Sequence, residues 1–600
     1  MEEIKKQKLR SEIDDKYKWH LDKIYASDEN WDEDFKTLKL NAPSLKEFQG
    51  RLKDGKTIYE FLKKSEEYTR LAEKLMMYAY LKYYEDTSNA KYQALKTKID
   101  IYLAEFNSYV AFFEPEILSL DKDVLLKIVE DTEELHEYRF TFATLLSQKE
   151  HVLPKEIEEV LALASDSMQA PENIRGMLAD ADMKFPVVEG ENGAKIQLTE
   201  ENYSSLIKSK DQKVREGAFK ALFGQYKNLE NTFATALVSS VKNFIFNSKV
   251  RHYKSALESS MQPNNIPTEV YTNAVKTIND NLGLLHRYVA LKKKMLGLNE
   301  IHMYDLYVPV TDFKSEHIEF EEAVEIVKKG LKPLGSEYLD IFSDGIDQGW
   351  VDVFENKGKR GGAFSWGSYD TMPYVLLNYN YELNDVSTLA HEMGHSLHSY
   401  YSRKEQPYQY HDYSLFLAEV ASTTNEILLI NYLIDNADDK ARKLFLVNQQ
   451  LEQIRTTVFR QLMFAEFELV VHEEIEKGEA LTAEDFNKIW HDLNVKYFGD
   501  DIVVDKEIDS EWARIPHFFS DFYVYQYATG YSAANAFANS ILEKGSEAVE
   551  KYKGFLKAGS SDYPIKVLQK AGVDMLTPKP IEATMHTFEH LLDVLEETIK

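Results

Sequence analysis

The residues with the clearest chemical potential are His391, Glu392 and His395, which form the pattern H-E-x-x-H. Residues four apart lie one turn apart on the same face of a helix, so both imidazoles can reach one metal ion. Glu392 then lies beside them, close enough to act on a metal-bound water. The chain has 16 His and 100 acidic residues, for which roughly 0.07 chance matches are expected. The pattern therefore favours a metal site of the zinc type.

A catalytic zinc ion usually keeps three protein ligands, so a third donor is expected downstream. The extended motif with a third His is absent, because Tyr401 stands at that position. A carboxylate must serve instead, and the candidates are Glu405, Asp412, Glu419 and Glu426. Glu419 and Glu426 fall in an apolar helical run, where a carboxylate needs a partner. They share one face, which suits one as a ligand and the other as an acceptor for a ligand imidazole.

His398 follows His395 by three residues and lies on the same helix face. It is a candidate metal ligand, a candidate neighbour that hydrogen-bonds the ligands, or a packed core histidine. The second and third interpretations are favoured over the first.

A second group of candidate residues lies in Trp512–Tyr531, which contains four tyrosines and one histidine. Tyr523, Tyr527 and Tyr531 recur every four residues, a spacing that places them on one face of a helix. Aromatic stripes of this kind usually belong to a core. Together with His517, however, such a row could donate hydrogen bonds to the oxyanion of a tetrahedral intermediate. We expect this role because the zinc motif is present elsewhere in the chain.

Helices are expected to carry most of these residues. From about Trp31 to Lys184, apolar residues recur at three- and four-residue spacing, as in amphipathic helices. The stretch Phe185–Leu198 has two β-prone runs around Asn192-Gly193 and predicts a hairpin, where we expect the main boundary of the chain. The aromatic run Pro373–Tyr381, in the glycine-containing segment 358–384, predicts a small sheet before the H-E-x-x-H helix.

The composition agrees with a large, mostly helical protein. Of the 600 residues, 44% are hydrophobic and 12% aromatic, whereas Gly (25) and Pro (15) are scarce. The chain contains no cysteine, which excludes disulfides, thiolate nucleophiles and cysteine-based metal sites. A bound metal must therefore be held by His, Asp or Glu.

The charge balance limits the possible partners. Lys and Arg total 71 against 100 Asp and Glu, and the formal net charge of −29 argues against nucleic-acid or anionic-membrane binding. The sequence shows neither a signal-peptide-like start nor an uncharged run of membrane-spanning length. The cytoplasm is therefore the expected location.

Three motifs taken together are similar to those of a known family. They are His391-Glu-Met-Gly-His-Ser-Leu-His398, Phe416-Leu-Ala-Glu-Val-Ala-Ser422 and His517-Phe-Phe-Ser-Asp-Phe-Tyr-Val-Tyr-Gln-Tyr-Ala-Thr-Gly530. The chain resembles the zinc peptidases grouped with thimet oligopeptidase and neurolysin, and most closely oligoendopeptidase F. The resemblance covers much of the chain, since residues 1–195 are similar to the N-terminal helical part of that subgroup.

This resemblance implies a mainly α fold, described as a two-part helical ellipsoid with a deep substrate channel and a small β-sheet next to the H-E-x-x-H helix. It implies an N-terminal helical domain over residues 1–195 and a zinc metallopeptidase catalytic domain over residues 196–600. The implied activity is hydrolysis of internal peptide bonds in short unstructured oligopeptides, with one Zn²⁺ per chain as cofactor.

The resemblance also assigns roles by position. The zinc ligands would be His391, His395 and Glu419. Glu392 would be the general base that activates a zinc-bound water. Two residues would lie around the ligands, namely Glu426 and His398. The remaining catalytic groups would be His517, Tyr523 and Tyr527, although their spacing differs slightly from that in thimet-oligopeptidase-like members.

Two alternatives remain open at this point. A zinc aminopeptidase or carboxypeptidase on a related helical scaffold would need a pocket that anchors a free peptide terminus. A helical binding protein without catalytic activity would bind no stoichiometric metal.

The strand-like run Tyr374–Tyr379 suggests how a peptide would be held. An extended peptide can add to an exposed strand edge through main-chain hydrogen bonds, which gives broad sequence tolerance. We further expect folded proteins to be spared, because the N-terminal helices would cover the channel that leads to His391 and His395.

Overall fold

The computed structural model of the protein describes residues 7–311, 313 and 316–600. Its packing divides the chain into two compact units, each assembled from three segments. The first unit comprises residues 1–149, 315–429 and 537–572, and the second comprises residues 150–314, 430–536 and 573–600. Both units are mostly helical, as the sequence predicts.

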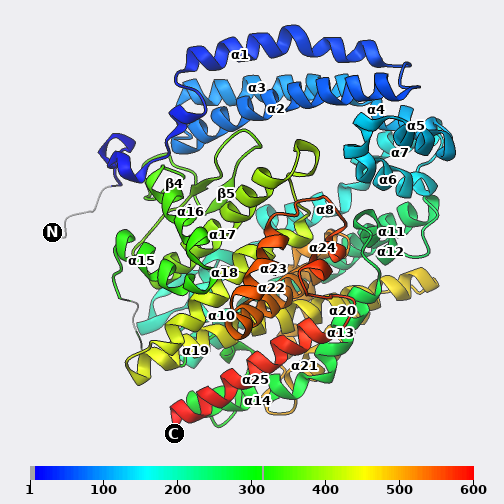
Figure 1. The fold of residues 1–600 in the computed structure, drawn as a ribbon. Helices are drawn as coiled ribbons and strands as arrows, with labels where there is room; N and C mark the ends of the chain where they lie inside the picture. Colours follow the sequence, from blue (N-terminus) through cyan, green and yellow to red (C-terminus); the bar gives the residue numbers. More distant parts are fainter. Residues whose placement is uncertain (1–6, 312, 314–315) are drawn as a thin grey trace. The chain divides into compact units, whose positions relative to one another are not determined.

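The first unit begins with helices whose apolar faces share one core. They are α1 (Asp28–Asn41), α2 (Gly55–Glu85), α3 (Ala90–Val110), α4 (Phe113–Ser119), α5 (Lys122–Asp131) and α6 (Arg139–Gln148). Figure 1 shows α1, α2 and α3 side by side. Leu75, Tyr78 and Leu81 of α2 are buried, which confirms the predicted periodicity. The buried indole of Trp31 in α1 donates a hydrogen bond to the carbonyl of Leu75 at 2.8 Å.

The later segments of the first unit supply six more helices and a sheet. The helices are α15 (Phe320–Gly330), α16 (Ser336–Asp347), α17 (Leu383–Glu405), α18 (Leu415–Asp435; up to residue 429), α23 (Ser546–Leu556) and α24 (Pro564–Lys570). The predicted small sheet is present and has the strand order β4-β6-β5. β4 (Val351–Asp352) runs parallel to β6 (Tyr374–Leu376), and β5 (Phe364–Trp366) runs antiparallel to it.

The strand expected to bind peptide is not the open one. β6 lies at the centre of the sheet, is buried and pairs with a strand on each side, so Tyr374–Tyr379 offers no free edge. β5 pairs with β6 on one side only within the described part of the chain. The open edge therefore belongs to β5, and the prediction based on β6 is wrong because the short strand β4 could not be recognised in the sequence.

The second unit consists of helices with two small pairs of strands. The helices are α7 (Lys155–Met168), α8 (Ala170–Gly176), α9 (Glu200–Leu206), α10 (Gln212–Asn228), α11 (Glu230–Val250), α12 (Ala256–Met261), α13 (Glu269–Asp280), α14 (Leu282–Met295), α19 (Lys440–Ile454), α20 (Arg460–Lys477), α21 (Ala483–Phe498), the part of α22 (Tyr525–Lys544) up to residue 536, and α25 (Lys579–Ile599). β3 (Ile301–His302) and β7 (Ile502–Val503) pair in parallel.

The predicted hairpin is confirmed in the second unit. β1 (Val187–Glu189) and β2 (Lys195–Gln197) are antiparallel, with Val188 opposite Ile196. Asn192 and Gly193 between them have φ values of 57° and 75°, the left-handed region that this residue pair favours. The division into domains at residue 195 stays a prediction. Among the described helices, none has the length and apolar character needed to span a membrane.

Candidate active site

Helices α17 and α18 position the predicted metal ligands, and their close packing depends on Gly394. A Cβ atom at Gly394 would lie 2.6 Å from the Cα of Ser422 in α18, so a larger residue would push the helices apart. The side chain of Asn425 in α18 also donates a hydrogen bond to the carbonyl of Ala390 in α17 at 3.0 Å. These contacts bring Glu419, near the start of α18, beside the H-E-x-x-H face.

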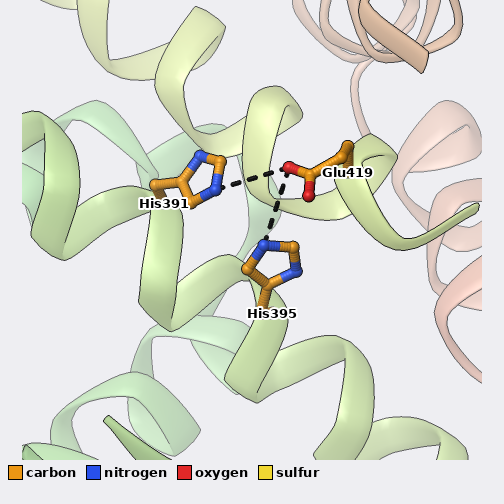
Figure 2. Close-up of side chains that lie close together, drawn as sticks. All are labelled: His391, His395 and Glu419. Atoms are coloured by element: carbon orange, nitrogen blue, oxygen red, sulfur yellow. Dashed lines mark ion pairs between the residues drawn. The ribbon is translucent and has the colours of Figure 1, made fainter. Parts of the chain in front are cut away.

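The three predicted ligands lie together. The Oε2 atom of Glu419 is 3.4 Å from Nε2 of His391 and 3.7 Å from Nε2 of His395 (Figure 2). Within the described residues, this is the one group of three His, Cys, Asp or Glu side chains whose ligand atoms all lie within 4.8 Å of one another. The donor set of two imidazoles and one carboxylate is typical of catalytic zinc sites.

Each of the two imidazoles has a further neighbour besides Glu419. Nδ1 of His391 lies 3.2 Å from Oε2 of Glu426, and the His395 ring hydrogen-bonds the backbone of Ala418. Burial opposes a charge on His391, but the hydrogen bond to Glu426 and the nearby carboxylates outweigh it and raise the pKa of His391 to about 9. Burial and the charge on His391 lower the pKa of His395 to about 3.

Glu392 is buried beside His391, His395 and Glu419, which together form the metal-type cluster. Burial raises the pKa of its carboxyl group to about 7, and the neighbouring carboxylates of Glu419 and Glu426 act in the same direction. The charge on His391 and, more weakly, a hydrogen bond from the backbone of Ser365 in β5 partly offset this rise. A carboxyl group with a pKa near neutrality is suited to accept a proton and to return it.

His398 packs within the first unit. Its ring stacks on Tyr413 with centroids 3.7 Å apart and contacts the ring of Phe555 at 4.9 Å. The side chain is buried, and its Nδ1 atom has no hydrogen-bond partner among the described residues. This is the environment of a packed core histidine, and its predicted role beside the ligands remains a prediction.

The second predicted group, His517, Tyr523 and Tyr527, also lies together and belongs to the second unit. The Tyr527 hydroxyl is 3.4 Å from Nε2 of His517. The ring of Tyr523 is stacked with that of His517 at 5.9 Å and perpendicular to that of Tyr527 at 5.5 Å. Burial lowers the pKa of His517.

The tyrosines do not form the single helical stripe that their spacing predicts. α22 begins at Tyr525, so Tyr523 reaches Tyr527 from the loop before the helix. Tyr531 is buried in α22. The spacing therefore identified two tyrosines that do meet but assigned the wrong local structure to the first.

Two residues that support these clusters were not predicted from the sequence. Gly394 is a glycine inside a helix, which costs about 1 kcal/mol relative to Ala and so signals a close approach. Glu468 of α20 accepts a hydrogen bond from the backbone N–H of Phe522 at 2.9 Å, next to Tyr523. It occurs in the apolar run Phe464–Val471, the same signal that singled out Glu419.

The protein is mostly helical, and Glu419 lies beside the two histidines of the H-E-x-x-H helix. This combination is typical of metallopeptidases. The family model described as peptidase family M3 matches residues 205–587, and the one described as oligopeptidase F matches residues 116–185. The chain therefore belongs to peptidase family M3.

Individual relatives match nearly the whole length of the chain. Oligopeptidase PepF of Bacillus subtilis is 46% identical over 98% of this chain and 88% of its own length. The crystal structure of oligoendopeptidase-F from Enterococcus faecium has a TM-score of 0.72 at 38% identity, covering 95% of this chain and 99% of its own. A chain from Chlamydophila abortus has a TM-score of 0.95 at 34% identity, covering 99% of this chain and all of its own.

Proposed function

We propose that this protein is a zinc-dependent endopeptidase that hydrolyses internal peptide bonds of short, unstructured oligopeptides. The single observation that carries the proposal is the cluster of His391, His395 and Glu419 with the buried Glu392 beside it. Membership of peptidase family M3 and relatives named oligopeptidase and oligoendopeptidase support the substrate class.

The spacing of the donor atoms supports one Zn²⁺ per chain. Bonds of about 2.1 Å to a tetrahedral ion separate its ligand atoms by roughly 3.4 Å. The separations of 3.4 and 3.7 Å between Glu419 and the two imidazoles are close to that value. Glu426 would accept the Nδ1 proton of His391 and so hold its Nε2 lone pair toward the ion.

Glu392 is the proposed general base. Bound zinc would polarise the scissile carbonyl and lower the pKa of water at the site. The Glu392 carboxylate would accept the proton of the attacking water and then deliver it to the leaving amine. Its pKa of about 7 suits both transfers near neutral pH.

His517, Tyr523 and Tyr527 are proposed to donate hydrogen bonds to the oxyanion that forms at the scissile carbonyl. The hydroxyl of Tyr527 and the ring of His517 are already in hydrogen-bond contact, and Tyr523 packs against both. Hydroxyl donors held in a fixed geometry stabilise such a charge without reorganisation during the reaction.

The substrate is proposed to pair with the open edge of β5. Val375 of β6 donates its N–H to Trp350 on the β4 side, so Ser365, opposite Val375 in β5, faces away from β6. Ala363 directly precedes β5, and backbone groups two residues apart in an extended segment face the same way. Ala363 should therefore present its amide to a peptide. Ala363→Pro removes that donor and is expected to raise KM while zinc stays bound; Ala363→Ser keeps the donor and serves as the control. Unchanged KM in Ala363→Pro would contradict pairing at this edge.

A peptide digest tests the function directly. A defined peptide mixture that includes N- and C-blocked members is incubated with the protein before and after chelation, and the products are identified by mass spectrometry. Internal cleavage of blocked peptides that is lost on chelation supports the proposal. Cleavage of free termini alone would favour an exopeptidase, and absence of stoichiometric zinc would favour a binding protein.

We also propose a cytoplasmic location with oligopeptides as the partners, and no nucleic acid or membrane. The net charge of −29 supports the exclusion of nucleic acid. Fractionation of the native organism with detection of the protein tests the location.

A further inference from the structure

Three polar side chains with buried atoms lie at the loop of the second unit that carries Tyr523. Glu468 and His472 project from α20, each only 2% exposed, and Asp521 comes from the loop between Phe519 and α22. Nε2 of His472 is 3.9 Å from Oδ1 of Asp521. Asp521 is remote in sequence from Glu468 and His472, and the peptidase chemistry proposed above uses none of the three.

The group is unusual because it leaves polar atoms unsatisfied. Oε2 of Glu468, Nε2 of His472 and Oδ1 of Asp521 are buried and have no hydrogen-bond partner among the described residues. Burying such atoms without partners is costly, and native proteins keep few of them. A group retained at this cost calls for a role other than general stability.

Phe522, between Asp521 and Tyr523, is held in a strained conformation. Its φ is 48°, in the left-handed region that a bulky residue rarely adopts. Such strain persists only where the surroundings fix the backbone, and it collects at functional sites.

Several contacts fix this turn. Oε1 of Glu468 accepts the N–H of Phe522 at 2.9 Å, and the hydroxyl of Ser260 in α12 donates to the carbonyl of Asp521 at 2.8 Å. The Phe522 ring packs on His472 with centroids 4.4 Å apart and on Tyr271 at 5.5 Å. All of these residues belong to the second unit, as does Tyr523.

We propose that Glu468 is a positioning residue, which holds the strained turn at Phe522 and thereby keeps the Tyr523 ring in its place beside Tyr527 and His517. The inference rests on the proposed function, because it concerns the position of Tyr523, which is proposed to contact the reacting carbonyl. Tyr523 follows the turn directly, so relaxation at Phe522 displaces its side chain. A displacement of about 1 Å can cost about 100-fold in rate.

The shape of the Glu468 side chain indicates which substitution is conservative. Burial raises the pKa of Glu468 well above its usual value and lowers the pKa of His472 to about 4. A carboxyl group and an amide have nearly the same shape, and both keep an oxygen that accepts the Phe522 N–H. Glu468→Gln therefore preserves the contact, whereas Glu468→Leu removes it.

The first measurement compares these two variants. Glu468→Leu is expected to lower kcat about 100-fold with little change in KM, and Glu468→Gln to keep most of kcat. Hydrogen–deuterium exchange of the peptide containing Phe522 should accelerate in Glu468→Leu only. Glu466→Leu is the matched control, because it removes an acid of the same helix that binds Lys496 and Asn279 away from this loop. It should leave kcat unchanged.

The second measurement asks whether Glu468 acts through Tyr523. In a Tyr523→Phe background, Glu468→Leu should change kcat little, because the hydroxyl that it positions is already absent. Circular dichroism and zinc content establish that each variant is folded. If Glu468→Leu does not fold, Ser260→Ala, which removes the second backbone anchor, should lower kcat in the same direction and lose its effect in the same background.

The outcomes separate this inference from the proposed function. Equal peptide cleavage by the wild type and Glu392→Gln would overturn the proposed function, and the exchange of the Phe522 amide would still decide whether Glu468 holds the turn. An active wild type and inactive Glu392→Gln, combined with full kcat in Glu468→Leu, would overturn the inference. A loss in Glu468→Leu that is equally large in the Tyr523→Phe background would overturn it as well.

Discussion

His391 and His395 stand one turn apart on a single helix, whereas Tyr523 reaches Tyr527 from a loop in which the preceding residue has a φ of 48°. In the metal-type cluster, regular helix geometry sets the direction of two of the three donors. In the aromatic cluster, the direction of Tyr523 depends on Glu468, which is 54 residues away in sequence from the Phe522 amide that it binds.

This difference has consequences for how each cluster responds to change. A cluster built on regular helices tolerates substitutions around it as long as the helices keep their separation. A cluster built on a strained loop depends on distant contacts that fix the backbone. Substitutions that affect only one of the two clusters test this difference.

The largest effect is expected from Glu392→Gln. Loss of the proton acceptor should lower kcat by about 10³-fold or more, because general acid–base groups contribute roughly 10²–10⁴-fold. Zinc should remain bound, since Glu392 is not a proposed ligand. Kinetics on a blocked peptide and metal analysis check this prediction. The matched variant Glu419→Gln should lose zinc, and equal zinc loss in both would show that the roles are misassigned.

The next effect is that of Tyr523→Phe. Removing one hydroxyl donor to the oxyanion should lower kcat by about 10²–10³-fold with little change in KM. Steady-state kinetics with zinc content as a control measures this effect. Tyr83→Phe, which removes a hydroxyl from α2 in the other unit, should have no such effect. Full activity of Tyr523→Phe would remove the second cluster from the reaction.

Gly394→Ala tests the separation of α17 and α18. The added Cβ would meet the backbone of Ser422, and overpacking of this kind costs about 1–3 kcal/mol. Displacement of Glu419 should also weaken zinc binding, which competition with a chelator measures. Gly554→Ala in α23 is the control, because a Cβ there meets no atom within 4 Å. Equal zinc affinity in both variants would show that the close approach does not matter.

The last effect concerns Asp521 and pH, and it acts on stability rather than on turnover. Burial and the charge of Glu476 raise the pKa of Asp521 to about 7 from 3.8. Between these values the folded state binds more protons than the unfolded state, so the stability of the wild type should fall as pH rises. The slope is at most about 1.4 kcal/mol per pH unit. Asp521→Asn lacks this titration, so its stability relative to the wild type should improve from pH 4 to 7. A constant difference in denaturant unfolding across that range would contradict the prediction.

The sequence predicts those parts of the molecule that depend on local spacing. The H-E-x-x-H pair, the apolar run around Glu419 and the turn at Asn192-Gly193 each contain their own signal. In the structure, His391, His395 and Glu419 lie close together and the hairpin forms. A strand of two residues such as Val351–Asp352 carries too little signal, so the strand order of the sheet was not predictable.

Contacts between distant segments were also beyond prediction. The spacing of Tyr523 and Tyr527 fits a helix, yet the helix begins only at Tyr525 because Phe522 adopts a left-handed turn. That turn is held by Glu468, and nothing near Phe522 in the sequence announces the contact. A hydrogen bond between residues so far apart in sequence can be identified only from the three-dimensional structure.

The short length of β5 also bears on turnover. A strand of three residues offers few main-chain partners, each with a net contribution of about 0.5–1.5 kcal/mol. A peptide held this way has a short residence time, and hydrolysis divides its contacts between two fragments. Each fragment then keeps only part of the attraction, so the products should leave readily and inhibit the reaction weakly.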